Sequence, residues 1–436
     1  MINKPKIVAP GWSYNKAIVA SKYWADEVYV WVPFTSLRMR QNKIESFDDL
    51  QKTVDAVRWN WSKVLLTMNI FPRNTDIKIF ESVVERISEV NPDAIIFSDP
   101  GTFNIIRKHL PNTPLHLSTQ TSTLNYESIR FWYDLWVKRV VLARELHINE
   151  IKEIKEKIPE MELEIFVHWA MCMSYSGRCL LGDYMSGRQA NKWECSHACR
   201  FKYKVRLEEE RRPWKLIQLE WDESGSHILS SKDLCAIDRL EEIIPYVDAL
   251  KIEWRSKSEF YVWSIVKAYK HVRDQILAWK EINPEIKNLV NVVPHREYRD
   301  GFLFNKLQDY PEGESVIASE WNERGDLKIA STSSRNDQGT STTLNTWWPL
   351  FNRNYFWVFT DQFIEKNGKK YFQIDPKEVI SPNMEIKYIS PNNIGKLKIL
   401  DIINSSWKQL ESSNCNTPWV YILTDIDLAG REILYE

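Results

Sequence analysis

The chain has 436 residues and a mass of 51.7 kDa, enough for two domains or for one large barrel with an appendage. Hydrophobic residues make up 43% and charged residues 27%, which excludes a disordered, collagenous or coiled-coil chain. The 58 Lys and Arg nearly cancel the 59 Asp and Glu, so the net charge of −1 excludes attraction to nucleic acid or membrane through a global field.

The N-terminal residues contain no long apolar stretch, and no segment reaches the roughly 18 apolar residues needed to span a bilayer. We therefore expect a cytoplasmic protein without a signal peptide or a membrane partner. In that reducing compartment the six cysteines are not expected to form a disulfide framework.

Short β-branched segments alternate with longer amphipathic segments from residue 6 to about residue 275. This alternation predicts βα units that close into a parallel (β/α) TIM-like barrel, assigned to residues 1–280. The predicted strands are Ile7 to Ala9, Glu27 to Val32, Lys63 to Met68, Ala94 to Phe97, Leu115 to Ser118, Arg139 to Leu142, Leu163 to Val167 and Ala249 to Ile252. The predicted helices include Ser46 to Val57, Ile77 to Val90 and Ile148 to Lys157.

Polar residues follow several of the predicted strands. They are Asn69, Asp99, Ser118 to Gln120, Arg144 and Cys172. Because the C-terminal ends of barrel strands meet at one face, we expect these residues to gather where such folds carry their chemistry. Plainer interpretations exist for some: Asp99-Pro100-Gly101 is typical of a turn, and Arg144 with Glu145 of a surface ion pair.

The pattern changes after about residue 280. Residues 281–326 are punctuated by Pro, Asn and Gly and are interpreted as a linker and loop region. Residues 327–436 alternate polar and apolar residues, which predicts a small C-terminal antiparallel β domain. Its predicted strands are Tyr355 to Phe359, Tyr371 to Ile374, Glu385 to Ile389, Lys396 to Ile403 and Val420 to Leu423.

Four cysteines in the segment CMSYSGRCLLGDYMSGRQANKWECSHACR have the spacing C-x6-C-x15-C-x3-C; they are Cys172, Cys179, Cys195 and Cys199. Four thiolates suit either a tetrahedral zinc or an iron–sulfur cluster. The wide first spacing favours a 4Fe–4S cluster, with zinc and buried unliganded thiols as alternatives. His168 lies close by, although a lone histidine is more often a packed residue than a ligand.

Several motifs together resemble the peptidase U32 family over roughly residues 6–310. They are ELEIFVHWAMCMSYSGRC from Glu162, SSKDLC from Ser230, KIEWRSKS from Lys251, APGWS from Ala9, FSDPG from Phe97, LSTQTSTLN from Leu117 and VVLARELH from Val140. The resemblance implies an oxygen-independent hydroxylase that carries a 4Fe–4S cluster. Its implied substrates are tRNA wobble uridine, a ribosomal RNA cytidine or a ubiquinone precursor, with prephenate as oxygen donor in the RNA branches.

The resemblance assigns the cluster ligands to the four cysteines of the spaced segment, with Cys235 as the reserve for the fourth position. Chain length and the added β domain are most similar to the tRNA-hydroxylating branch, so tRNA or another RNA is the expected partner. A collagenase-like peptidase and a non-catalytic cluster-bearing binding protein are the alternatives. The sequence contains neither His-Glu-x-x-His nor Gly-x-Ser-x-Gly, which counts against a peptidase.

A dicarboxylate such as prephenate is best held by a bidentate arginine. The expected catalytic residues are Arg178, Arg255, Arg144 and Asp99, with Arg188 as a further arginine between the cysteine pairs. Lys251, Glu253 and Arg255 alternate at a strand end and should share one face. The basic residues between Arg200 and Arg212 either contact RNA phosphates or form a solvated strand face.

Glycine is unusually rare, at 13 residues or about 3% of the chain against a usual value of about 7%, while tryptophan occurs 20 times. The family resemblance leads us to expect glycine at seven tryptophans: Trp12, Trp24, Trp31, Trp136, Trp169, Trp193 and Trp254. The indole is a poor substitute where glycine is used for its backbone freedom. We hypothesise that the source organism reads UGA as glycine, and that the sequence gives tryptophan for this codon.

Overall fold

The computed structural model describes the greater part of the chain. The described residues are 4–33, 35, 44–170, 175, 181, 202–203, 220–222, 225–227, 233–253, 259–293, 295, 298–304, 355–376, 379–390, 394–413, 420–426, 428 and 433–435. The four predicted cluster cysteines lie outside these residues, as do Arg178, Arg188 and Arg255. Of the basic segment between Arg200 and Arg212, only the backbone of Lys202–Tyr203 is described.

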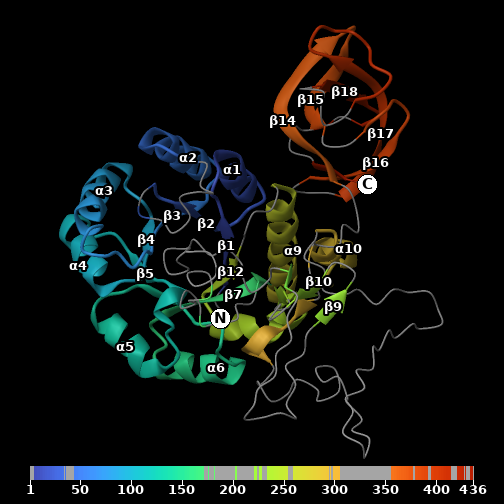
Figure 1. Ribbon diagram of the computed structural model, residues 1–436. Helices are drawn as coiled ribbons and strands as arrows, with labels where there is room; N and C mark the ends of the chain where they lie inside the picture. The colour runs from blue at the N-terminus through green and yellow to red at the C-terminus, as the bar shows by residue number, and fades with distance from the viewer. Residues whose placement is uncertain are drawn as a thin grey trace, which may run out of the picture.

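Eight parallel strands form a closed barrel in the first part of the chain (Figure 1). The strands are β1 (Lys6–Pro10), β2 (Glu27–Trp31), β3 (Lys63–Met68), β4 (Ala94–Phe97), β5 (Leu115–Leu117), β6 (Arg139–Val141), β7 (Glu162–Ala170) and β12 (Ala249–Ile252). Each pairs with its neighbour in chain order, and β12 closes the ring by pairing with both β1 and β7. The TIM-like barrel predicted from the sequence is confirmed.

Amphipathic helices surround this barrel because their apolar residues recur every three or four positions. In α3, for example, Phe80, Val83, Val84 and Ile87 are buried against the sheet. The helices are α1 (Tyr14–Lys22), α2 (Phe47–Trp59), α3 (Ile77–Val90), α4 (Pro100–His109), α5 (Tyr126–Asp134), α6 (Ile148–Lys157), α8 (Leu240–Ile243), α9 (Glu259–Leu277) and α10 (Pro284–Lys287). Short 3-10 turns, such as η1 (Thr119–Thr121) and η7 (Gly301–Leu303), complete this part.

Strand β7 is longer than its neighbours and has two partners along its length. Its residues 164–168 pair in parallel with β12, and its last residues pair antiparallel with β11 (Asp233–Cys235). In this register Ala170 lies opposite Asp233, so the two residues that flank the inserted segment 171–232 are adjacent. This insertion contains a three-stranded antiparallel sheet of β8 (Lys202–Tyr203), β9 (Glu220–Asp222) and β10 (Gly225–His227).

The C-terminal domain is a second, antiparallel barrel. Its strands are β14 (Tyr355–Lys366), β15 (Lys369–Pro376), β16 (Glu385–Ile389), β17 (Ile394–Asn404), β18 (Val420–Thr424) and β19 (Ile433–Tyr435), closed in the order β14-β15-β18-β17-β16-β19. The predicted antiparallel domain is confirmed, and β19 is a strand that the sequence pattern missed. Helix α9 lies between the two barrels (Figure 1), where Lys267 donates a hydrogen bond to the carbonyl of Ser390.

Candidate functional site at the mouth of the parallel barrel

Charged side chains occupy the interior of the barrel near the N-terminal ends of its strands. The buried guanidinium of Arg139 on β6 contacts Glu27 at 2.5 Å, Glu162 at 2.8 Å and Glu164 at 2.9 Å. Burial alone would lower the pKa of Arg139, but hydrogen bonding and attraction from these carboxylates outweigh it and the pKa is raised. The guanidinium therefore stays charged and ties three strands together across the barrel.

A second layer lies above Arg139. The ammonium of Lys251 on β12 binds Glu164 at 2.6 Å and lies 4.8 Å from the ring centroid of Tyr29. Burial would raise the pKa of Glu164, yet Lys251 and Arg139 lower it. His116 on β5 is fully buried, and burial followed by repulsion from Arg139 and Lys251 holds its pKa well below the usual range. It is therefore a neutral imidazole.

The third layer is the mouth of the barrel, formed by the C-terminal ends of the strands and the loops that follow them. Arg144, after β6, donates to Glu253, after β12, at 2.6 Å, and both side chains are buried. The guanidinium carbon of Arg144 lies 4.1 Å from the ring centroid of Phe166 on β7. Arg144 is thus a buried cleft residue rather than half of a surface pair, and it borders a small apolar cavity with Leu234 and Phe302.

Four polar residues after β3, β4 and β5 form a connected group, here called the mouth cluster: Asn69, Ser98, Ser118 and Gln120. The Asn69 amide donates to Ser118 at 3.1 Å, and the Ser98 hydroxyl donates to the Gln120 side-chain oxygen at 3.0 Å. Gln120 is fully buried, and its side-chain NH₂ has no hydrogen-bond partner among the described residues. A buried donor left open in this way suits an acceptor oxygen of a ligand.

Two tryptophans also stand at the mouth. Trp31 ends β2 and Trp12 follows β1, and their rings meet edge to face with centroids 4.6 Å apart. Both are almost fully buried. These two indoles therefore fill part of the mouth, at two of the positions where the sequence resemblance leads us to expect glycine.

Asp99 has a structural role in this arrangement. Its carboxylate accepts the backbone N–H of Thr102 at 3.0 Å, which caps the N-terminus of α4. Pro100 and Gly101 occupy the first turn of that helix, so the DPG segment is a helix start, where the plainer interpretation of the sequence had a turn. The carboxylate remains at the mouth but is engaged with backbone.

His168 and Cys235 are register partners on β7 and β11. The His168 ring lies 3.3 Å from the Tyr269 hydroxyl, and the Cys235 sulfur lies 3.7 Å from the same oxygen. Burial lowers the pKa of His168 to about 3 and raises the pKa of Cys235 to about 11. Both groups are therefore uncharged at neutral pH, and His168 is a packed, hydrogen-bonded residue.

The described residues contain no group of three or more His, Cys, Asp or Glu side chains placed to hold a metal ion. None of the described helices is long and apolar enough to cross a membrane.

The carboxylate of Glu162 makes the stability of the barrel depend on pH. Burial would raise the pKa of Glu162, but Arg139, then Lys6 and Lys138, lower it from 4.5 to about 2. A carboxylate with a lowered folded pKa stabilises the fold above its unfolded pKa, and this stability is lost as the pH falls. We expect the free energy of unfolding to decrease between about pH 4.5 and about pH 2.

Urea unfolding across this pH range measures the effect, with Glu162→Gln as the comparison. The difference between the two proteins should shrink as the pH falls, because the variant lacks the titrating group. A difference that stays constant down to pH 2.5 would show that Glu162 is not linked to folding.

The sequence predicts Arg144, Asp99, Asn69, Ser118 and Gln120 at the C-terminal face of the barrel, and the structure has these residues there. Ser98 is the one member of the mouth cluster that was not predicted. The layered charges formed by Glu27, Arg139, Glu162 and Glu164 were not predicted either. A signal was available, since charged residues recur at alternate positions within β-branched strands, as Glu162 and Glu164 do on β7.

Comparison with known proteins gives the family context. The chain matches the model of peptidase family U32 over residues 12–311. It is 33% identical to tRNA hydroxylation protein P of Escherichia coli (strain K12) over 401 residues, which cover 81% of this chain and 88% of that protein. It is 32% identical to tRNA hydroxylation protein P of Haemophilus influenzae over 381 residues, covering 77% and 82%. It is also 31% identical to a collagenase of Porphyromonas gingivalis over 280 residues, covering 62% and 65%.

Proposed function

The chain belongs to the peptidase U32 family, and we propose that it is an iron–sulfur-dependent hydroxylase of an RNA base, with tRNA wobble uridine as the favoured substrate. The observation that carries this proposal is the similarity to tRNA hydroxylation protein P, which extends over 88% of the Escherichia coli protein. The collagenase match covers only 65% of its relative.

The cluster would be held by Cys172, Cys179, Cys195 and Cys199, with Cys235 in reserve. The insertion that carries the first four thiols begins and ends beside the mouth, at the paired residues Ala170 and Asp233. Four thiolates are the donor set that a 4Fe–4S cluster requires. When bound, the cluster would supply an iron centre able to exchange electrons with the bound substrate or co-substrate. Cys235 fits less well, because it is a buried, protonated thiol packed against Tyr269.

The mouth offers donors for the oxygen-rich ligands that this chemistry needs. Arg144 supplies a buried guanidinium on the face of Phe166, and Gln120 supplies an open N–H donor. A carboxylate of prephenate, or a carbonyl of the target base, would accept from such groups. Arg178 and Arg255 are proposed to complete the carboxylate site.

A cysteine peptidase would require a thiol activated by a neighbouring histidine. Within the described part of the chain, the cross-strand pair of His168 and Cys235 shows the opposite shifts, since burial keeps the thiol protonated and the imidazole neutral. Cys235 with His168 therefore does not fit the activated thiol of a cysteine peptidase.

Expression of the chain in an Escherichia coli strain that lacks tRNA hydroxylation protein P tests the proposal. We expect hydroxylated uridine to reappear in hydrolysed tRNA analysed by mass spectrometry. The Cys172→Ala variant should restore none and should contain less iron, because one thiolate ligand is lost. Cleavage of denatured collagen by the purified protein, without any hydroxylated uridine, would overturn the proposal in favour of a peptidase.

A further inference from the structure

Four helices of the parallel barrel end in the same way, with a tryptophan in the left-handed backbone conformation. These residues are Trp24 after α1, Trp61 after α2, Trp136 after α5 and Trp279 after α9, with φ angles of 65°, 66°, 62° and 54°. Left-handed backbone costs an L-residue with a side chain about 1 kcal/mol, whereas glycine adopts it freely. Helices commonly place glycine at this position for that reason.

The hydrogen bonds show that each tryptophan occupies the glycine position of a Schellman motif, in which two backbone N–H groups bond back to the last helical turn. After α1, Trp24 donates to Ser21 at 3.0 Å and the next residue, Ala25, donates to Ala20 at 3.0 Å. After α5, Trp136 donates to Tyr133 at 2.8 Å and Val137 donates to Trp132 at 3.1 Å.

The ends of α2 and α9 repeat the pattern. Trp61 donates to the carbonyl of Arg58 at 2.9 Å, and its successor donates to Val57 at 3.4 Å. Trp279 donates to Ile276 at 3.2 Å, and its successor donates to Gln275 at 3.0 Å. The same backbone geometry therefore occurs four times, each time with tryptophan at the one position that favours glycine.

A fifth case lies in the C-terminal domain. Trp407 has a φ of 65° in the tight turn after β17, where it donates to Asn404 at 3.0 Å and Asn404 donates to Lys408 at 3.0 Å. Such short loops between antiparallel strands usually place glycine at the left-handed position. This turn is unrelated to the four helix ends in fold and in sequence.

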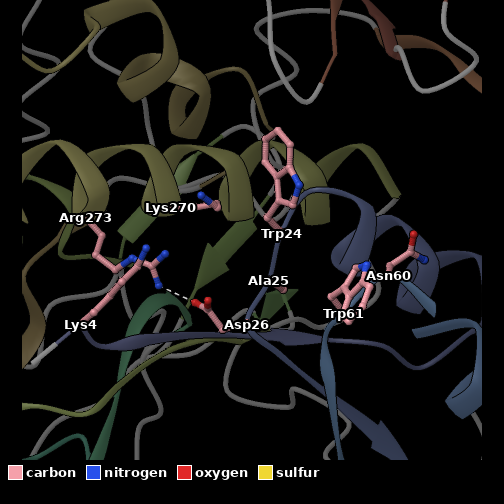
Figure 2. A pocket seen from close by; sticks show the side chains of 8 residues that line it. All are labelled: Lys4, Trp24, Ala25, Asp26, Asn60, Trp61, Lys270 and Arg273. Carbon is pink, nitrogen blue, oxygen red and sulfur yellow. Dashed lines mark hydrogen bonds and ion pairs between the residues drawn. The ribbon is translucent and has the colours of Figure 1, made fainter. Parts of the chain in front are cut away.

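Three of the five indoles gain little from burial at these positions. Trp61, Trp136 and Trp279 are 96%, 85% and 85% exposed, so burial does not compensate for the backbone cost. Figure 2 shows the side chains of Trp24 and Trp61 projecting from the turns after their helices, apart from the ion pair of Arg273 with Asp26. The other non-glycine residues with positive φ in the described ranges are three Asn and one Ser, which tolerate this conformation better than tryptophan.

We infer that the native protein has glycine at positions 24, 61, 136, 279 and 407, and that the codon at each is UGA decoded as glycine. Positions 24 and 136 coincide with glycines expected from the family resemblance, while positions 61, 279 and 407 follow from backbone geometry alone. One reassigned codon accounts for five unfavourable residues of one type. It also reduces the scarcity of glycine and the abundance of tryptophan, because these five positions alone change the printed counts of 13 Gly and 20 Trp to 18 and 15.

Trp132 is the matched control, because its indole is buried among Phe97, Phe103 and Phe131 and lies inside helix α5. The inference therefore assigns position 132 to a genuine tryptophan, with UGG as the expected codon.

Peptide mass spectrometry of the protein from its native source, together with the sequence of its gene, tests the assignment. We expect glycine and UGA at the five positions, and tryptophan and UGG at position 132. Tryptophan in the peptides that span positions 61, 136 and 279 would overturn the inference. Neither readout depends on the activity of the protein, so failure of the proposed function would leave this result unaffected.

Stability of substituted proteins tests the physical basis separately. Trp61→Gly and Trp136→Gly should each raise the midpoint of urea unfolding, whereas Trp61→Ala and Trp136→Ala should give smaller gains because alanine keeps the backbone cost. Trp132→Gly should lower the midpoint. A fall in the midpoint for both Trp61→Gly and Trp136→Gly would contradict a glycine requirement at these helix ends.

Discussion

Replacement of Arg139 by leucine is expected to destabilise the barrel by about 3–5 kcal/mol, the range for removing one partner of a buried ion pair. Leucine leaves Glu27 and Glu164 facing each other in the barrel interior without the guanidinium that both contact. Glu164 then keeps only Lys251 and Glu27 only Lys6 as cationic partners. The buried negative charge is no longer fully balanced, and keeping it or protonating it costs free energy. Urea unfolding followed by circular dichroism measures the loss, with the transitions of the two domains fitted separately.

Lys108→Leu provides the surface control for this experiment. Lys108 pairs with Glu81 at 2.8 Å, but its side chain is 67% exposed, so its removal should change stability by less than about 1 kcal/mol. Adding Glu27→Gln to Arg139→Leu should recover part of the loss, because one buried carboxylate that has lost its guanidinium partner is removed. Equal stability of Arg139→Leu and the unaltered protein would show that the charged layer does not hold the barrel together.

On the proposed function, the Arg144→Lys variant is expected to retain the iron content of the unaltered protein but to lose about 30-fold in hydroxylation, which corresponds to about 2 kcal/mol of transition-state stabilisation. Lysine preserves the charge but has no planar fork, so it cannot lie on Phe166 and bind both Glu253 and a ligand carboxylate. Turnover of tRNA under saturating co-substrate, together with the iron content, measures the effect.

Arg130→Lys is the matched control, because Arg130 lies exposed on α5 and contacts only a backbone carbonyl among the interactions described for it. It should retain full turnover. Glu253→Gln should give a smaller loss of turnover than Arg144→Lys. It weakens the interaction that positions Arg144 but leaves the guanidinium in place. Unchanged turnover of Arg144→Lys would remove Arg144 from the site.

The repeated βα pattern made the architecture of the parallel barrel predictable. Most predicted strands contained β-branched residues and alternated with helical patterns, and α3 and α6 have the predicted limits, Ile77–Val90 and Ile148–Lys157. Buried parallel strands and amphipathic helices give strong local signals because each must place its apolar residues on a defined face. Strand β19 was missed because it has only three residues, which are too few to show the alternation of polar and apolar residues that predicts a strand.

The site was predictable only in part, for a physical reason. Position after a strand end is enough to place Arg144 and Gln120 at the mouth, because parallel strands share one polarity. The partner of Arg144 could not be deduced in this way, since Glu253 lies 109 residues away and meets it only through closure of the barrel. Sequence spacing could not show either that the Asp99 carboxylate caps α4.

The pairing of Ala170 with Asp233 has a consequence for how such proteins can diversify. Strand pairing holds the two ends of the inserted segment at adjacent positions, and the entropic cost of closing a loop between fixed ends rises only slowly with its length. Segments of other lengths could be exchanged at this junction without altering the span that they must bridge. A chimaera could carry the corresponding segment of a relative between Ala170 and Asp233. It would show which properties of the protein depend on the parallel barrel and which depend on the inserted segment.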